Sequence, residues 1–220
     1  MKKIIIAIDS FKGCLTSAEA GKAAEKGIKS INPSCHTSVI PIADGGEGLL
    51  DVLIRATKGK YITLSAHGPL MKMAKTHYGL SGNGRTAIIE MAAISGLPLV
   101  PIEQRNPMLT TTFGTGELIK DALNKGCRNF IIGIGGSATN DAGLGMLQAL
   151  GFRFLDKSGH TLGTGGQIME AVANIDTSGI HPALRETHFM VACDVANPFY
   201  GPDAVSYTHL RAHETSLHLV

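Results

Sequence analysis

Hydrophobic and polar residues alternate along the chain in blocks that predict β-strands followed by α-helices. Residues 3–8 form a β-branched run that is apolar on both faces, which is typical of a parallel strand covered by helices on both sides. A capping-box pattern, Thr-Ser-Ala-Glu, then begins a predicted helix over residues 16–31. A strand over residues 38–42 and a helix over residues 49–56 follow in the same order. The beginning of the chain therefore predicts two strand–loop–helix units.

The middle of the chain changes to an antiparallel style. Three strand-like runs follow one another closely, at residues 61–66, 71–80 and 85–91, and the Ser-Gly-Asn-Gly between the last two is typical of a hairpin turn. Strands and helices then alternate again, with strands expected over 129–134, 152–155 and 188–193 and helices over 115–125, from residue 141 to about 150 and over 168–173. These patterns predict an α/β protein with a doubly wound parallel core.

Composition narrows the class of protein. The 220 residues are 44% hydrophobic and 17% charged with a net charge of +2, which fits a globular protein and excludes a polybasic nucleic-acid binder. The first apolar run is shorter than the roughly 7–15 residues of a signal peptide, and no stretch reaches the roughly 20 apolar residues that span a bilayer. The four cysteines lie far apart, which argues against a zinc site. We therefore expect a reduced, cytoplasmic protein that does not bind membranes.

A glycine-rich loop follows the strand predicted over residues 129–134. Gly133, Gly135 and Ala138 have the GxGxxA spacing of a dinucleotide-binding loop, and Asp156 follows about where a ribose-binding acid is expected. An NAD-dependent dehydrogenase is therefore one interpretation, beside a nucleotide-phosphate site and a plain tight turn. The Thr-Asn-Asp sequence that comes next favours Mg²⁺ or a phosphate network, because a dinucleotide loop needs small apolar residues there.

Polar side chains also follow the first two predicted strands. Asp9, Ser10 and Lys12 bring together a carboxylate, a hydroxyl and an ammonium group, which can neutralise a phosphate or a carboxylate. Asp44 and Glu47 surround a glycine pair, and two carboxylates so close together suit a bound cation or a general base. The same residues also fit a solvated turn and an acidic helix N-terminus, and these alternatives stay open.

Two later segments carry similar groups. The hydroxyl-rich run at residues 110–117 can bind phosphate, or it can cap the helix that follows. Asp194 ends the last predicted strand, where an acid serves as a catalyst or as a cap. Because the carboxyl ends of parallel strands meet at one edge of a sheet, we expect the two strand-end loops, the glycine-rich loop and Asp194 to share that edge.

Six motifs in a fixed order resemble the type 1 glycerate kinase family of bacteria. They are IIIAIDSFKG, IPIADGGEG, IIEMAAISGLPLVP, RNPMLTTTFGTGELI, IIGIGGSATNDAGLGMLQALG and VACDVANP, and the resemblance extends from residue 1 to about residue 204. It implies ATP-dependent phosphorylation of D-glycerate with Mg²⁺, and it leaves open whether the product is 2- or 3-phosphoglycerate. It also implies two α/β domains, one flavodoxin-like and one restriction-endonuclease-like. The oligomeric state, monomer or homo-oligomer, stays open.

Phosphoryl transfer, implied by this resemblance, assigns roles to the strand-end residues. Asp194, Asp44 and Lys12 are predicted to be catalytic, with Asp194 favoured as the general base. Glu47 and Asp141 are predicted to bind the metal. The residues predicted to bind substrate or phosphate lie in the first strand-end loop, the hydroxyl-rich run and the glycine-rich loop, and they are Asp9, Ser10, Thr111, Thr112, Gly135, Gly136, Ser137, Thr139 and Asn140.

The resemblance further predicts how the chain is divided. Residues 1–62 with 108–150 are expected to form the flavodoxin-like core, and residues 63–107 with 151–204 the second domain. Residues 205–220 have no counterpart in the family and form a separate tail.

Family members are nearly twice as long as this chain, and the resemblance therefore predicts a truncated kinase. Ile8 and Cys14 stand where the family usually has Pro and Ser, away from the predicted chemistry. A sheet without its neighbouring strands exposes edges and apolar faces, so we expect low solubility and little kinase activity. A non-catalytic nucleotide-binding remnant is the remaining alternative.

Overall fold

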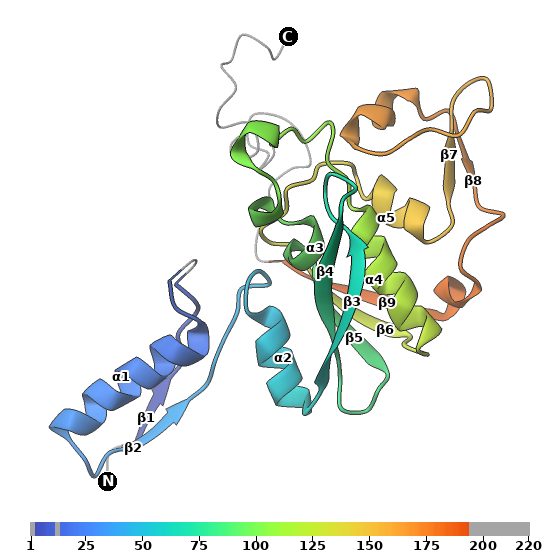
Figure 1. The fold of residues 1–220 in the computed structure, drawn as a ribbon. Coiled ribbons are helices and arrows are strands. Elements are labelled where there is room, and N and C mark those ends of the chain that lie inside the picture. Colours follow the sequence, from blue (N-terminus) through green and yellow to red (C-terminus); the bar gives the residue numbers. More distant parts are fainter. Residues whose placement is uncertain (1–2, 12–13, 194–220) are drawn as a thin grey trace.

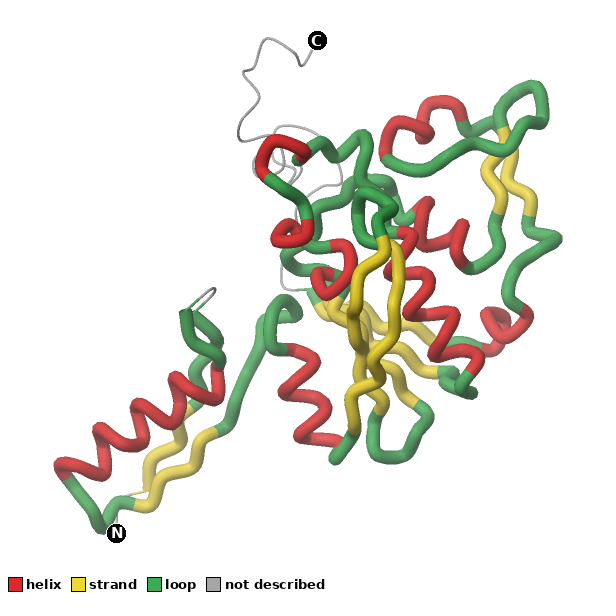
Figure 2. Tube along the Cα trace, viewed as in Figure 1, coloured by secondary structure: helices red, strands yellow, loops and turns green. Residues whose placement is uncertain are grey.

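The computed structural model describes residues 3–11 and 14–193, which form a small N-terminal unit beside a larger body (Figure 1). The N-terminal unit contains β1 (Lys3–Ile6), α1 (Ser17–Ile31) and β2 (His36–Val39), and its two strands pair in parallel. Both strands end earlier than predicted, because the chain leaves the ladder after Ile6 and Val39 to form loops. Figure 2 shows the long loop after β2 reaching from this unit to the larger body.

Helix α1 begins where the capping box predicts. The Oγ1 atom of Thr16 accepts a hydrogen bond from the backbone N–H of Glu19 at 3.2 Å, and Oε2 of Glu19 accepts one from the backbone N–H of Thr16 at 2.9 Å. The bond from the Thr16 backbone N–H and a second one from the Thr16 hydroxyl, at 2.8 Å, favour the charged carboxylate and hold the pKa of Glu19 below its usual value. The prediction of a helix ending just before Asn32 is also confirmed.

The larger body is built on a five-stranded sheet in the order β3-β4-β5-β6-β9. The first three strands are antiparallel neighbours, and the last two run parallel to β5. Each strand lies within two residues of its predicted bounds, and the bounds are β3 (Lys60–His67), β4 (Met73–Leu80), β5 (Thr86–Glu90), β6 (Asn129–Gly133) and β9 (His188–Ala192). The sheet is therefore mixed, with the predicted parallel part at β5, β6 and β9.

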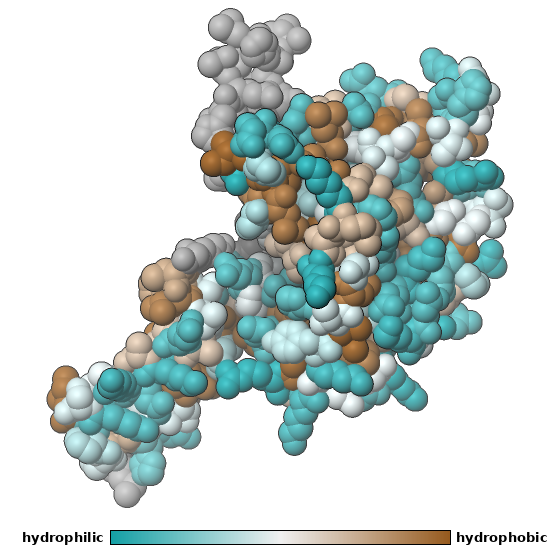
Figure 3. Space-filling model, in the orientation of Figure 1, coloured by the Kyte–Doolittle hydropathy of each residue, from teal (hydrophilic) through white to brown (hydrophobic). Residues whose placement is uncertain are grey.

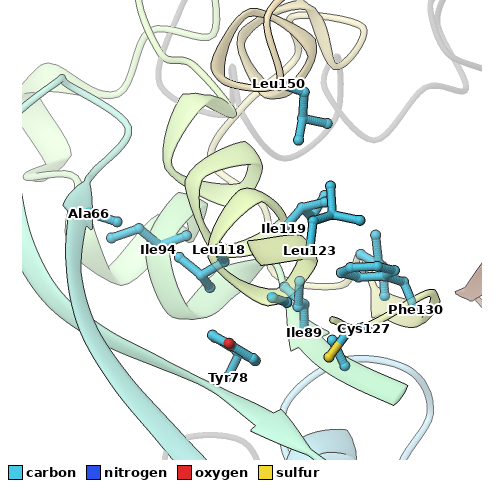
Figure 4. Packing of buried hydrophobic residues seen from close by; sticks show 13 residues of the cluster. Ala66, Tyr78, Ile89, Ile94, Leu118, Ile119, Leu123, Cys127, Phe130 and Leu150 are labelled. Carbon is cyan, nitrogen blue, oxygen red and sulfur yellow. The ribbon is translucent and has the colours of Figure 1, made fainter. Parts of the chain in front are cut away.

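Helices cover both faces of the sheet at β5, which explains why its three central residues, 87–89, are all apolar and buried. Ile88 is fully buried against α2 (Leu49–Thr57) on one face. Ile89 is fully buried on the other face against α4 (Phe113–Asn124), as Figure 4 shows. Burial of one such side chain contributes about 1.5–3 kcal/mol, so the body has a substantial core of its own.

The remaining described elements are short. An antiparallel pair stands apart from the large sheet and consists of β7 (Arg153–Leu155) and β8 (Asn174–Asp176). Residues 168–173, predicted as an α-helix, instead lie largely in a 3₁₀-helix. The helical segments are α3 (Ala92–Ser95), η1 (Leu97–Leu99), η2 (Ile102–Gln104), α5 (Leu144–Ala149), η3 (Gly166–Ala171) and η4 (Pro182–Glu186).

Strand pairing differs from the predicted division of the chain. That division separates residues 63–107 from residues 108–150, whereas β5 and β6 pair in parallel over five residues of one sheet. The sequence pattern of a strand shows how many of its faces are buried but does not identify its neighbour, which explains the difference. The mixed α/β class is confirmed, and the two domain names stay a prediction.

Large apolar side chains are exposed at several places among the described residues, and two of these places bear on the predicted open edges. In the N-terminal unit, Ile5 is 61% exposed and Ile31 is 88% exposed, and Figure 3 shows brown hydrophobic atoms there among teal polar ones. On β9, the last strand in the sheet order, Phe189, Met190 and Val191 are also exposed. These surfaces fit the predicted open edges and apolar faces.

Candidate active site

The loop that carries Asp44 and Glu47, residues 44–48 and here called the acidic loop, lies across the carboxyl ends of two parallel strands. A side chain at Gly133, the last residue of β6, would place its Cβ 2.3 Å from the carbonyl oxygen of Gly45. A Cβ at Gly45, whose φ is 94°, would lie 2.7 Å from the carbonyl oxygen of Ala192 at the end of β9. Glycine at these positions lets backbone lie directly on backbone, and the loop is thereby seated on the sheet edge.

The acidic loop also touches the glycine-rich loop that follows β6. A Cβ at Gly135 would lie 2.8 Å from the Cα of Gly46, again a contact between two backbones. The described structure thus brings together the second strand-end loop and the glycine-rich loop, at the sheet edge that the parallel strands define.

The two carboxylates of the acidic loop differ in their surroundings. Asp44 is half-buried, and its Oδ1 accepts a hydrogen bond from the backbone N–H of Gly46 at 2.9 Å. Glu47 is exposed and lines a cavity of about 310 Å³ between the N-terminal unit and the larger body. One acid is therefore held by its own loop, and the other faces an open volume.

Residues after β1 reach the same cavity. Ser10 lines it, and the Ser10 hydroxyl is buried without a hydrogen-bond partner among the residues that the structure describes. Oδ1 of Asp9 accepts a hydrogen bond from the backbone N–H of Ser10 at 2.6 Å. Ser17 joins the two strand-end segments, since its hydroxyl donates to the carbonyl of Ile8 at 2.6 Å and accepts from the N–H of Ile42 at 3.1 Å.

Lys12 and Asp194, two of the three residues predicted to be catalytic, lie outside the described residues. In the sequence they adjoin described parts of the site, because Lys12 follows Phe11 and Asp194 follows Cys193. Their roles stay predictions.

Glu90 is a residue of this region that the sequence interpretation missed. It ends β5, and its Oε1 accepts a hydrogen bond from the backbone N–H of Leu50 at 2.8 Å. Burial raises the pKa of Glu90, and the charge of Asp51 raises it further, against hydrogen bonds from backbone N–H groups that lower it. The sequence did contain a signal for Glu90. It is an acidic residue at the end of a strand whose central residues are buried on both faces.

Part of the glycine-rich loop bonds within itself. The hydroxyls of Ser137 and Thr139 lie 2.8 Å apart, and the backbone N–H of Thr139 donates to the Ser137 hydroxyl at 3.0 Å. Gly136 has a φ of 73°, and the backbone N–H of Ala138 donates to the carbonyl of Ser95 at 2.9 Å. Asn140, also predicted to bind phosphate, is half-buried. The loop has a defined shape next to the acidic loop, and its phosphate role stays a prediction.

Asp141, predicted to bind metal, lies in a hydrogen-bonded cluster with Thr111 and Thr112. Asp141 is 1% exposed, and it accepts hydrogen bonds from the backbone N–H of Thr112 at 2.8 Å and from that of Gly145 at 3.1 Å. The hydroxyls of both threonines also bond to its carboxylate. These contacts tie the start of α4 to the start of α5, which is a structural role. Metal binding by Asp141 and phosphate binding by the two threonines stay predictions.

The dinucleotide-binding interpretation does not fit this loop. Helix α5 begins at Leu144, well after Ala138, so the fingerprint residues do not open a helix whose N-terminus could hold a pyrophosphate. Asp156 lies in a turn after β7, where its carboxylate accepts from the backbone N–H groups of Ser158 and His160. β7 pairs with β8 rather than with β6, so Asp156 is not where a ribose-binding acid belongs. The spacing of the glycines reflects close backbone contacts instead.

Comparison with protein families matches residues 4–209 to the glycerate kinase family. The match continues slightly past residue 204, the predicted end of the resemblance, into a segment that lies outside the described residues. It covers the acidic loop, Glu90 and the glycine-rich loop.

Individual relatives agree with the family match. A glycerate kinase of Bacillus subtilis (strain 168) is 54% identical over 200 residues, which are 91% of this chain and 52% of that protein. A glycerate 2-kinase of Escherichia coli (strain K12) is 48% identical over 204 residues, 93% of this chain and 54% of that protein. A crystal structure assigned to glycerate kinase 2 of Salmonella typhimurium LT2 superposes with a TM-score of 0.84 at 45% identity, covering 99% of this chain and 58% of that one. The chain spans about half the length of the curated relatives it matches.

Proposed function

Because the chain belongs to the glycerate kinase family, we propose that its function is the ATP-dependent phosphorylation of D-glycerate to phosphoglycerate. One observation best supports this function. The backbone of the acidic loop packs on the carboxyl ends of β6 and β9, beside the glycine-rich loop. Ligands of open α/β sheets bind at such an edge. Carboxylates and backbone groups gathered there suit a reaction that consists mostly of positioning and charge neutralisation.

Each group of the site has a distinct task in this proposal. The glycine-rich loop and Lys12 contact anionic oxygens of the phosphates, and Asp9 and Ser10 contact the substrate. Asp194 acts as the general base that takes the proton of the glycerate hydroxyl, which must be aligned with the transferred phosphoryl group. An Asp194→Asn variant is accordingly expected to lose turnover and to keep its affinity for ATP.

The acidic loop fits Mg²⁺, the metal that this reaction requires. Mg²⁺ in phosphoryl-transfer sites usually takes one or two protein carboxylates together with substrate phosphates and waters, and Asp44 and Glu47 supply two carboxylates on one short loop. Among the described residues, no group of three or more His, Cys, Asp or Glu side chains is placed so that it could hold a metal ion by itself. In this proposal the phosphates supply further ligands. When bound, Mg²⁺ neutralises charge on the phosphates.

The substrate class in this proposal is a small hydroxy acid, and the setting is the cytoplasm. Within residues 3–11 and 14–193, none of the helices has the length and apolarity that a membrane crossing requires. A second candidate function, nucleotide binding without turnover, is favoured by one observation, the exposed apolar side chains of β9. Exposed apolar surface of this kind usually contacts further protein, and we expect turnover to depend on whether it is covered.

The experiment incubates the purified chain with ATP, Mg²⁺ and D-glycerate and follows phosphoglycerate by ³¹P NMR, which also separates the 2- and 3-phosphates. We expect product that depends on all three components and is lost in Asp44→Asn. Asp176→Asn serves as the control, since Asp176 ends β8, and Figure 1 shows β8 away from α2, the helix that follows the acidic loop. Binding of Mg²⁺-ATP without product would replace the kinase proposal by the non-catalytic one, and absence of both binding and product would overturn both.

A further inference from the structure

Helix α2, which follows the acidic loop, receives its N-terminal cap from another element. Its N-cap residue is Gly48, in a left-handed conformation with φ of 93°, and glycine has no side chain that could bond the first N–H groups of the helix. Glu90 provides an acceptor instead, because its Oε1 bonds the backbone N–H of Leu50 at 2.8 Å. A carboxylate at a helix N-terminus is also favoured by the helix dipole.

Both ends of this hydrogen bond are firmly anchored. Glu90 follows Ile88 and Ile89, which are fully buried on opposite faces of the sheet, and the next residue, Met91, donates its backbone N–H to the carbonyl of Gly133 at 2.9 Å. Leu50 is 1% exposed and packs in the cluster beneath α2. The bond therefore links the end of the acidic loop to the rigid centre of the sheet.

The acidic loop needs such a link because its own sequence is permissive. Three of its five residues are glycines, and Gly45 and Gly48 both adopt positive φ. Glycine-rich backbone populates many conformations unless other contacts select one. The backbone contact of Gly45 with Gly133 and Ala192 holds one end of the loop, and the bond from Glu90 to Leu50 holds the other.

We propose that Glu90 is a positioning residue that fixes the acidic loop, and with it Asp44 and Glu47, in the shape used for catalysis. This inference rests on the kinase function proposed above. Glu90 acts through the backbone of Leu50 and does not touch the reacting atoms. Its side chain also lines the 310 Å³ cavity, so direct contact with a ligand is the competing role that an experiment has to separate.

The test compares three variants with the unchanged chain. Glu90→Ala removes the acceptor, Glu90→Gln keeps an oxygen acceptor without the charge, and Glu117→Gln is a matched control. Glu117 also accepts a backbone N–H, that of His67 at 2.7 Å, and its other oxygen lies 2.9 Å from Nδ1 of the same histidine, so its carboxylate is bound to the end of β3 and is none of the groups assigned to substrate, phosphate or metal. Two measurements are made, amide hydrogen exchange at Leu50 and Gly46, and kcat and KM for D-glycerate.

We expect Glu90→Ala to speed exchange at Leu50 and Gly46 by about tenfold or more, because the local opening becomes easier. Its kcat should fall by about tenfold to a hundredfold with a smaller change in KM, as for a misplaced catalytic group. Glu90→Gln should recover most of both losses, and Glu117→Gln should change neither. If Glu90→Ala does not fold, Glu90→Asp, which shortens the reach by one methylene, takes its place.

Two results would overturn the proposal. Unchanged exchange at Leu50 and Gly46 in Glu90→Ala would show that the bond does not hold the loop. A Glu90→Gln variant as impaired in kcat as Glu90→Ala would assign Glu90 to direct contact with the ligand. If the unchanged chain has no turnover, the proposed function fails, and the exchange data alone still decide whether Glu90 holds the loop.

Discussion

The N-terminal unit and the five-stranded sheet use the same kind of strand in opposite surroundings. β1 is a run of isoleucines in a two-stranded parallel pair, where Ile5 is 61% exposed. β5 has an apolar centre, and its Ile88 and Ile89 are fully buried between helices on both faces. Parallel strands usually occur buried on both sides, and small isolated sheets are marginal in water. The comparison shows that an apolar strand stabilises the protein only as far as other elements cover it.

The largest effect is expected from shortening the same side chain in each region. Ile89→Ala should lower the free energy of unfolding by about 2–5 kcal/mol, because it leaves a cavity in a filled core. Ile5→Ala should change it by about 0.5 kcal/mol or less, since most of that side chain is in water already. Urea denaturation of both variants measures the difference, and a loss for Ile5→Ala as large as that for Ile89→Ala would mean that the N-terminal strands are covered in solution.

A smaller effect tests whether the two regions unfold together. Gly27 lies inside α1, and a Cβ there would meet no atom within 4 Å, so Gly27→Ala should stabilise the helix by about 0.5–1 kcal/mol. Because α1 packs mainly on β1 and β2, we expect slower amide exchange in α1 and an unchanged melting temperature for the sheet. If the free energy of unfolding of the sheet rose by the same amount, about 0.5–1 kcal/mol, and its melting temperature with it, the two regions would be one cooperative unit.

The smallest effect concerns the pH dependence of stability at Glu90. Its pKa is raised by burial and by Asp51 of α2, while His77 of β4 and the N–H of Leu50 lower it. A raised carboxyl pKa gives stability that is present below the unfolded pKa and is lost as the pH rises through the folded pKa. Glu90→Gln should therefore melt above the unchanged chain at pH 7, with the gap closing near pH 4. A gap that is the same at both pH values would contradict the raised pKa.

The sequence predicted those parts of the fold that depend on local pattern. The capping box at Thr16 and the strands that became β3 to β6 and β9 follow from side-chain chemistry within a few residues, and they lie where expected. The neighbour of β6 was not predictable in this way, because strand pairing is decided by contacts between distant parts of the chain. The late start of α5 has the same origin, since Asp141 bonds across to Thr112 and holds the preceding segment out of the helix.

In the candidate site, too, residues with a local sequence signal were predicted, and residues that act through distant contacts were missed. The acidic and glycine-rich loops were recognisable because their residue types are unusual and they follow apolar strands. Glu90 was missed because its significance lies in one bond to Leu50, which the sequence places far away. Phosphate binding by Thr111 and Thr112 was predicted from their hydroxyls and stays a prediction, and the structure adds that both side chains are buried and bond to Asp141.

The packing of the acidic loop on the ends of β6 and β9 has a consequence for the order of folding. Residues 44–48 leave the ribosome early, but the surface on which they rest is made by Gly133 and Ala192, which are synthesised much later. Contacts between such distant residues form late, after the loop-closure entropy has been overcome. The nascent chain therefore carries the carboxylates of the acidic loop without this support until residue 192 has been synthesised, and the loop is held in place only when β9 has joined the sheet.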